Sequence, residues 1–181
     1  METYIALLRG INVSGQRIIK MEWLRRQFEA MGFEQVRTYI QSGNIIFLTK
    51  KTTEKTLRKK IECTLEQALG YPVDVILRRP KEIEALIGSH PYGEMGAEES
   101  RKLYIAFLHE PPAAELQPPF LALQSPGESF VIAGREVYIS IAKDHPKPLF
   151  TNMLLEKKLK TVATTRNWAT VNKLLQLSAE D

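Results

Sequence analysis

Apolar runs and amphipathic stretches alternate along residues 3–78 in a regular order. Residues 3–8 form a short, mostly apolar run that is typical of a central strand. From residue 21 onward, Leu24, Phe28 and Met31 recur at the spacing of one helix face. The remaining pattern predicts strands at 36–40, 45–48 and 73–77 and a helix from Thr53 to Gly70. The order β-α-β-β-α-β is that of a ferredoxin-like unit.

The second half of the chain repeats this order less completely. The pattern predicts a helix at 80–87, a strand at 103–108, a hairpin of 129–132 with 137–141, and helices at 149–159 and 167–177. A short helical segment opened by Pro111-Pro112 is expected to stop at Pro118-Pro119. A helix thus takes the place of the last strand.

Together these elements predict an α+β fold of two ferredoxin-like halves, with antiparallel sheets covered by helices. The first half is a complete β-α-β-β-α-β unit, and the second is an incomplete β-α-β-β-α repeat with a C-terminal helix. The predicted ranges are 1–79 for the N-terminal half, 80–101 for a helix and linker, and 102–181 for the C-terminal half. The loop at 89–101, with two glycines and one proline, is expected to be a linker or lid.

Right-handed crossovers in such a unit give the strand order 4-1-3-2. The loop at 9–15 and the hairpin at 41–44 then share one edge of the N-terminal sheet, roughly 10 Å apart. Tyr71-Pro72 is expected at the same edge. By the same reasoning, the matching edge of the second half holds His109, the hairpin at 133–135 and the segment 164–168.

The composition and the single cysteine limit where the protein is expected to be located and which kinds of site it can contain. No apolar run approaches the roughly 18 residues of a membrane span, and the first residues do not resemble a signal peptide, so we expect a cytoplasmic protein without a membrane partner. The single cysteine, Cys63, excludes an internal disulfide and a multi-cysteine metal site. His90, His109 and His145 lack the spacing of metal ligands. We therefore predict neither a metal nor a cofactor.

The net charge of +4 is mildly basic, and the densest cationic stretch lies within residues 50–60. Such a run is typical of the solvated face of a helix, and the alternative is a patch for a polyanion. An RNA-recognition motif has the same topology but needs stacking aromatics on its central strands. Tyr4 and Phe47 are the only aromatic residues on the first and third strands, so this motif is not matched.

The polar residues at the shared edge suggest a binding site. Glycines at 10, 15 and 43 allow a backbone to approach a ligand closely, and Arg9 and Arg166 have the geometry to clamp a phosphate or carboxylate. The alternative is that Gly, Asn and Ser fill these places because turns and helix caps need them. The leading hypothesis is a site for a small anionic metabolite at the loop edge of the N-terminal sheet. Nucleic-acid binding through Lys50–Lys60 and a protein-interaction module, monomeric or homodimeric, are the alternatives.

No acid–base pair identifies an enzyme, because Asp144-His145 is an adjacency without a third partner. Whether the protein is an enzyme is therefore left open.

Three segments, Ala6–Gly15, Arg37–Phe47 and Thr164–Leu175, together resemble a bacterial family of uncharacterised proteins, domain of unknown function sixteen ninety-seven. The resemblance spans essentially the whole chain and implies a duplicated ferredoxin-like α+β fold, but no reaction. The ligand-binding residues that its motifs imply are Arg9, Gly10, Asn12, Gly15, Gln41, Ser42, Gly43, Asn44, Thr165, Arg166, Asn167 and Trp168. The chain departs from the family pattern at Ser14, where a second glycine is more usual, and at Pro148-Leu149, which replaces a Ser-Lys pair.

Overall fold

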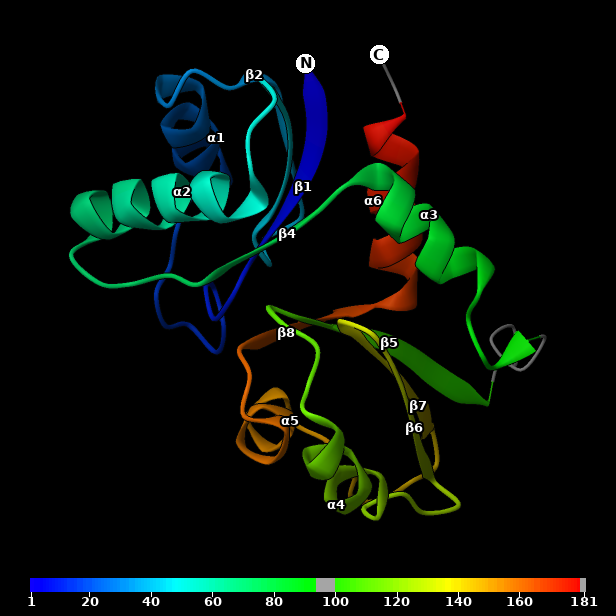
Figure 1. Ribbon diagram of the computed structural model, residues 1–181. Helices are drawn as coiled ribbons and strands as arrows, with labels where there is room; N and C mark the ends of the chain where they lie inside the picture. Colours follow the sequence, from blue (N-terminus) through cyan, green and yellow to red (C-terminus); the bar gives the residue numbers. More distant parts are fainter. Residues whose placement is uncertain (94–99, 180–181) are drawn as a thin grey trace. The chain divides into compact units, whose positions relative to one another are not determined.

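The computed structural model describes residues 1–93 and 100–179, and the chain forms two compact units (Figure 1). Unit 1 comprises Met1–Ala85 together with Lys173–Asp181, and unit 2 comprises Leu86–Asn172. Helix α6 (Trp168–Ser178) is shared between them, because its residues from Lys173 onward belong to unit 1. The central part of the predicted linker or lid, residues 94–99, lies outside the described residues.

Unit 1 contains a four-stranded antiparallel sheet in the order β2-β3-β1-β4. This is the predicted order 4-1-3-2 read from the other side, so the ferredoxin-like topology is confirmed. Its strands are β1 (Glu2–Leu8), β2 (Glu34–Tyr39), β3 (Asn44–Thr49) and β4 (Val75–Arg78). Helices α1 (Met21–Ala30) and α2 (Glu54–Leu69) cover one face of the sheet. Helix α3 (Pro80–Gly88) and the end of α6 lie on the other.

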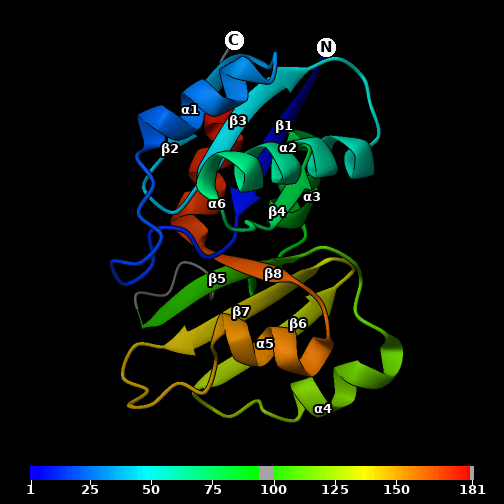
Figure 2. The same ribbon diagram turned by 90° about the vertical axis from the view of Figure 1, so that its left-hand side faces the viewer.

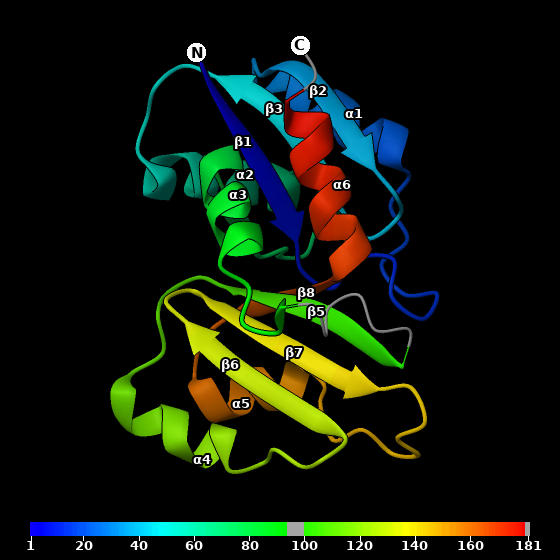
Figure 3. The ribbon, with the colours of Figure 1, turned by 90° about the vertical axis from the view of Figure 1, so that its right-hand side faces the viewer.

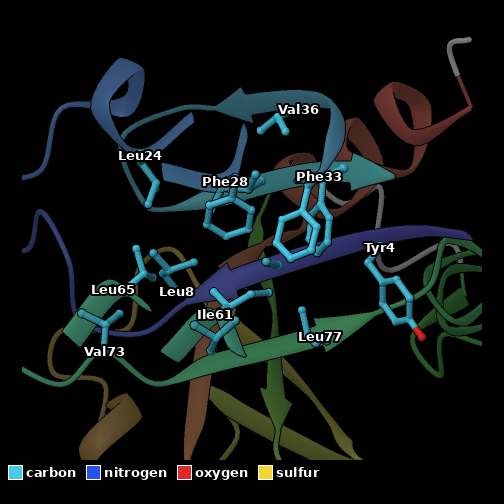
Figure 4. Close-up of a cluster of buried hydrophobic side chains, with 14 of the residues drawn as sticks. Tyr4, Leu8, Leu24, Phe28, Phe33, Val36, Ile61, Leu65, Val73 and Leu77 are labelled. Atoms are coloured by element: carbon cyan, nitrogen blue, oxygen red, sulfur yellow. The ribbon is translucent and has the colours of Figure 1, made fainter. Parts of the chain in front are cut away.

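The core of unit 1 follows from the alternation of side chains along β1. Tyr4, Ala6 and Leu8 point to the face under α1 and α2, where they meet Phe28 and Phe47 (Figure 4). The boundaries of α2 match its sequence signals. The hydroxyl of Thr53 accepts the N–H of Thr56, and Gly70 ends the helix in a left-handed conformation with φ of 77°.

Unit 2 has a second four-stranded antiparallel sheet, in the order β6-β7-β5-β8 (Figure 3). Its strands are β5 (Arg101–Leu108), β6 (Glu128–Ala133), β7 (Glu136–Ala142) and β8 (Ala163–Asn167). The 3-10 helix η2 (Ala114–Leu116) precedes α4 (Gln117–Leu121). Helix α4 and helix α5 (Asn152–Leu159) pack on one face of the sheet (Figure 2).

Two sequence expectations about unit 2 are wrong in detail. The strand expected to be missing is present as β8, so the second half is complete. Its sequence, Ala-Thr-Thr-Arg-Asn, buries Thr164 and Arg166, and these polar residues hide the apolar pattern by which a strand is recognised. Pro118 and Pro119 open α4 rather than stop a helix, because the first helical turn does not need the N–H that proline lacks.

The strand registers show that the two halves are built alike. Leu8 is opposite Val75 and Ile5 is opposite Arg78 in unit 1. In unit 2, Leu108 is opposite Ala163 and Ile105 is opposite Arg166. The paired strands carry a sequence repeat that the hydrophobic pattern alone did not single out: Tyr-Ile-Ala-Leu-Leu ends β1 and Tyr-Ile-Ala-Phe-Leu ends β5. Each sheet thus has a buried arginine at the same position of its last strand.

The outer edge of β6 is covered by the segment before it. The N–H and C=O of Glu128 are both hydrogen-bonded to the backbone of Ser125, at 3.1 and 2.9 Å. The side-chain oxygen of Gln124 accepts the N–H of Phe130 at 2.9 Å. The first part of this edge strand therefore has its outward-facing backbone groups satisfied within the chain.

Candidate functional site

The loop after β1 and the hairpin after β2 meet at one edge of the unit 1 sheet. Asn12 ties them together: its amide nitrogen donates to the carbonyl of Gln41 at 2.7 Å and to that of Ile19 at 3.0 Å. Its amide oxygen accepts the N–H of Ile19 at 2.7 Å. The two segments are in contact, closer than the predicted separation of roughly 10 Å between their strands. The shared edge exists, and the Asn12 side chain is one of the groups that build it.

The tip of the loop is a tight turn. The N–H of Gln16 donates to the carbonyl of Val13 at 2.9 Å, and the N–H of Asn12 donates to that of Arg17 at 3.1 Å. Between them, Ser14 and Gly15 both have positive φ, 51° and 74°. Two consecutive positive φ angles are typical of a type I′ turn, which favours glycine. The turn therefore favours glycine over Ser14 for a conformational reason.

The hairpin is held by Asn44 and Gly43. The fully buried amide of Asn44 donates to the carbonyl of Tyr39 at 3.0 Å and to the Ser42 hydroxyl at 2.9 Å. Gly43 has φ of 79°, and a Cβ atom there would lie 2.6 Å from Ile11 Cδ1. The carbonyl of Gly43 accepts the N–H of Leu8 at 2.8 Å. The glycine thus permits close packing of the hairpin against the loop.

Two cationic side chains lie at this edge. The guanidinium of Arg9 is 3.7 Å from a carboxylate oxygen of Asp74, and both side chains are partly exposed. The guanidinium of Arg17 lies over the ring of Tyr71, 4.9 Å from its centre, so Tyr71 is at this edge as predicted. Gly10, Gly15 and Gln41 are exposed around them. The edge carries positive charge, but its amide groups mainly fold the loop.

Only the start of the segment 164–168 lies at the predicted edge of the second sheet, where Thr164 is opposite Phe107. His109 and the hairpin at 133–135 do share one edge, since the backbone N–H of His109 donates to Val162 and that of Leu108 donates to Arg135. Because residues 163–167 form a strand antiparallel to β5, however, Asn167 is opposite Tyr104. Asn167 and Trp168 are therefore at the other end of the sheet.

The side chains of this segment have separate roles. Thr165 donates to Asn152 Oδ1 at 2.9 Å. The Nη1 atom of Arg166 donates to the hydroxyl of Thr164 at 2.7 Å and to the carbonyl of Thr165 at 2.9 Å. Burial lowers the pKa of Arg166 to about 10. Asn167 caps α6 by accepting the N–H of Thr170 at 2.8 Å.

An open pocket of about 360 Å³ lies in unit 2 where β8 ends and α6 begins. Strand β5 extends beyond Asn167, so residues at its start have β7 on one side and the pocket on the other. The pocket is lined by Arg101, Lys102, Leu103, Tyr104, Asn167, Trp168 and Ala169. Asn167 and Trp168 are the predicted site residues that it contains.

The pocket combines positive charge with aromatic surface. Arg101 donates from Nε and Nη2 to the hydroxyl and the carbonyl of Ser140, at 2.5 and 3.1 Å, which fixes its guanidinium. Lys102, the next residue of β5, is exposed and, because side chains alternate along a strand, points to the other face of the sheet. The ring of Trp168 stands edgewise to that of His90, with 4.9 Å between the ring centres. The first turn of α6 adds the positive end of a helix dipole.

Sequence reasoning missed Arg101, Lys102 and Tyr104 as neighbours of Asn167. The signal that identifies them is the strand pairing of 163–167 with β5, which the polar sequence of β8 concealed. His90 was considered only as a metal ligand. Its contact with Trp168 depends on the fold of the segment after α3, for which the sequence has no periodic pattern.

Two other features bear on catalysis and metal binding. Within residues 1–93 and 100–179, no group of three or more His, Cys, Asp or Glu side chains is placed to hold a metal ion.

His145 lies 3.5 Å from the buried carboxylate of Glu128. That carboxylate also accepts the N–H groups of Leu149 and Phe150, both at 2.8 Å, so it holds this segment against the start of β6. None of the described helices has the length and apolar character needed to cross a membrane.

The fold and the pocket define a duplicated ferredoxin-like α+β protein with a basic, partly aromatic hollow in its second half. Residues 1–138 match the model of the family Protein of unknown function (DUF1697), and the chain belongs to that family. A conserved bacterial protein of known structure from Streptococcus pneumoniae, SP0830, is similar over 99% of both chains, with 23% identity and a TM-score of 0.82. That similarity concerns the fold. None of the curated proteins matches the chain.

Proposed function

We propose that this protein binds a small ligand that carries an anionic group and a planar ring, in the pocket at the start of α6. The single observation that carries the proposal is an open hollow of about 360 Å³ whose lining includes Arg101, Lys102, Trp168 and the first turn of α6. A phosphate or carboxylate is the group that such a combination favours.

The anionic group belongs beside Arg101 and Lys102. Arg101 is held by Ser140 before any ligand arrives, so little side-chain entropy is lost when it binds. Asn167 accepts the N–H of Thr170 and so caps α6, whose first residues line the pocket.

The planar ring belongs against Trp168 and Tyr104, both of which line the pocket. Trp168 rests edgewise on His90, which restricts its ring and leaves aromatic surface to the pocket. A ligand with both features, such as a nucleoside monophosphate, matches the lining better than a bare anion. The loop edge of unit 1 supports an anion site less well, because Asn12 and Asn44 are engaged in folding it.

Fluorescence offers a direct test, since the chain has two tryptophans and only Trp168 lines this pocket. In a Trp23→Phe background, adenosine monophosphate is expected to change the Trp168 emission in a saturable way, and inorganic phosphate is expected to compete more weakly. Replacing Lys102 by Ala removes a charge-assisted hydrogen bond and should raise the Kd about tenfold.

The matched control is Lys157→Ala, which removes an exposed lysine from α5, outside the pocket lining. It should leave the Kd within a factor of two. Absence of any saturable change with adenosine monophosphate or phosphate would contradict the proposal. Equal weakening by Lys102→Ala and Lys157→Ala would show only non-specific attraction.

A further inference from the structure

The positive charge of the chain is concentrated in one segment. Residues 50–60 contain six cationic side chains and a single carboxylate, Glu54, a net charge of +5. The whole chain has a net charge of +4, so all remaining residues together sum to −1. The segment belongs to unit 1 and is separate from the pocket of unit 2. An excess of this size in so short a segment is an electrostatic footprint for a polyanion.

The structure divides the six cations into two kinds. Lys60 is used within unit 1: its Nζ donates to the carbonyl of Met31 at 2.7 Å and lies 5.1 Å from the centre of the Phe33 ring. The other five form the basic surface, which comprises Lys50, Lys51, Lys55, Arg58 and Lys59. The four lysines of the basic surface are exposed and Arg58 is partly exposed.

Helix geometry gathers these side chains on one side of α2. Lys55, Arg58 and Lys59 are spaced three and four residues apart, as residues on one helix face are. Leu57 and Ile61, which point into the core, take the opposite face. Lys50 and Lys51 come from the short connection that precedes the helix.

The carboxylate that follows the basic surface along α2 makes a hydrogen bond to the start of β4. Glu62, three residues after Lys59, accepts the N–H of Val75 at 3.0 Å, at the start of β4. Glu54 is in the first turn of α2, where a negative charge is favoured by the helix dipole. The five cations of the basic surface therefore outnumber the two carboxylates Glu54 and Glu62 on this part of α2, and the surface keeps a net positive charge.

We propose that the basic surface binds the phosphate backbone of a nucleic acid without reading its sequence. The surface contains cations but no aromatic side chain on which a base stacks, so contacts to phosphates account for the whole affinity. A lipid surface is a poorer partner. The large exposed apolar residues of the described chain are Met1, Val13, Ile18, Ile40, Leu149 and Met153, none of them in residues 50–60, whereas peripheral membrane segments pair basic with apolar anchors.

The salt dependence of binding tests this proposal on the full chain. Fluorescence anisotropy with labelled 20-nucleotide RNA and DNA is measured between 50 and 200 mM salt. Five phosphate contacts predict an affinity loss of about 10²- to 10³-fold over this range, through counterion release. The triple variant K55E/R58E/K59E should bind at least 100-fold more weakly at 50 mM salt.

The matched control is K143E/K147E/K157E, which makes the same charge change at exposed lysines of unit 2. It should weaken binding by less than fivefold, and circular dichroism melts check that both variants fold. Equal losses in the two variants would overturn the proposal, because they would reflect net charge alone. Undetectable binding of both nucleic acids at 50 mM salt, or binding only to vesicles containing phosphatidylserine, would overturn it as well.

Discussion

The loop edge of unit 1 and the pocket of unit 2 contain similar residue types but use them differently. At the loop edge, the amides of Asn12 and Asn44 bond to backbone carbonyls and hold the loop against the hairpin. At the pocket, Asn167 caps a helix whose first turn borders an open hollow, lined in part by residues 101–104 of β5. Asparagine side chains thus hold the loop against the hairpin in unit 1, whereas in unit 2 Asn167 caps the helix that borders the pocket. Polar residues in a family motif are not evidence for a ligand until their partners are known.

The glycines of the two β-hairpins give the sharpest contrast. Gly43→Ala should cost about 4 kcal/mol of folding stability, since it combines backbone strain at φ of 79° with overpacking against Ile11. Gly134→Ala in the β6–β7 hairpin has φ of 59° but nothing within 4 Å of the new methyl group, so about 1 kcal/mol is expected. Urea denaturation of both variants measures the difference. Equal losses would mean that Gly43 is needed for its conformation and not for packing.

The next largest difference in stability is expected between variants of the two arginines of the predicted site. Arg166→Ala is expected to lose about 3 kcal/mol, because it removes a buried side chain and its hydrogen bonds to Thr164 and Thr165. Arg9→Ala should lose less than about 0.5 kcal/mol, since its pair with Asp74 is long and partly exposed. Thermal and urea unfolding of the two variants provide the comparison. A similar loss at Arg9 would indicate that the loop edge depends on that ion pair.

The smallest expected effect is a gain at the tip of the loop. Ser14 has φ of 51° next to Gly15, in a turn that favours glycine at both positions. Ser14→Gly should therefore raise the stability of unit 1 by about 0.5 kcal/mol. The comparison change Ser42→Gly lies outside the residues of positive φ and removes the hydroxyl that accepts from Asn44, so it should lower stability. Denaturation midpoints of the two variants decide whether the loop tip is strained.

The parts of the fold that the sequence predicted are those with strong local patterns. The apolar run at 3–8, the amphipathic stretch from residue 21 and the caps Thr53 and Gly70 all specify their elements locally. The sequence did not predict strand β8 because Thr164 and Arg166 are buried polar residues that break the apolar pattern. That error concealed the pocket, which depends on Asn167 being opposite Tyr104. The missing information was a strand pairing between distant segments, for which no local signal exists.

The covered edge of β6 bears on how the protein behaves at high concentration. An open edge strand offers its backbone groups to a strand from another molecule, which is a common route to aggregation and fibre growth. Here Ser125 occupies both outward groups of Glu128, and Gln124 occupies the N–H of Phe130. An incoming strand would first have to displace these contacts. The segment before β6 therefore hinders the addition of a strand at the start of this edge.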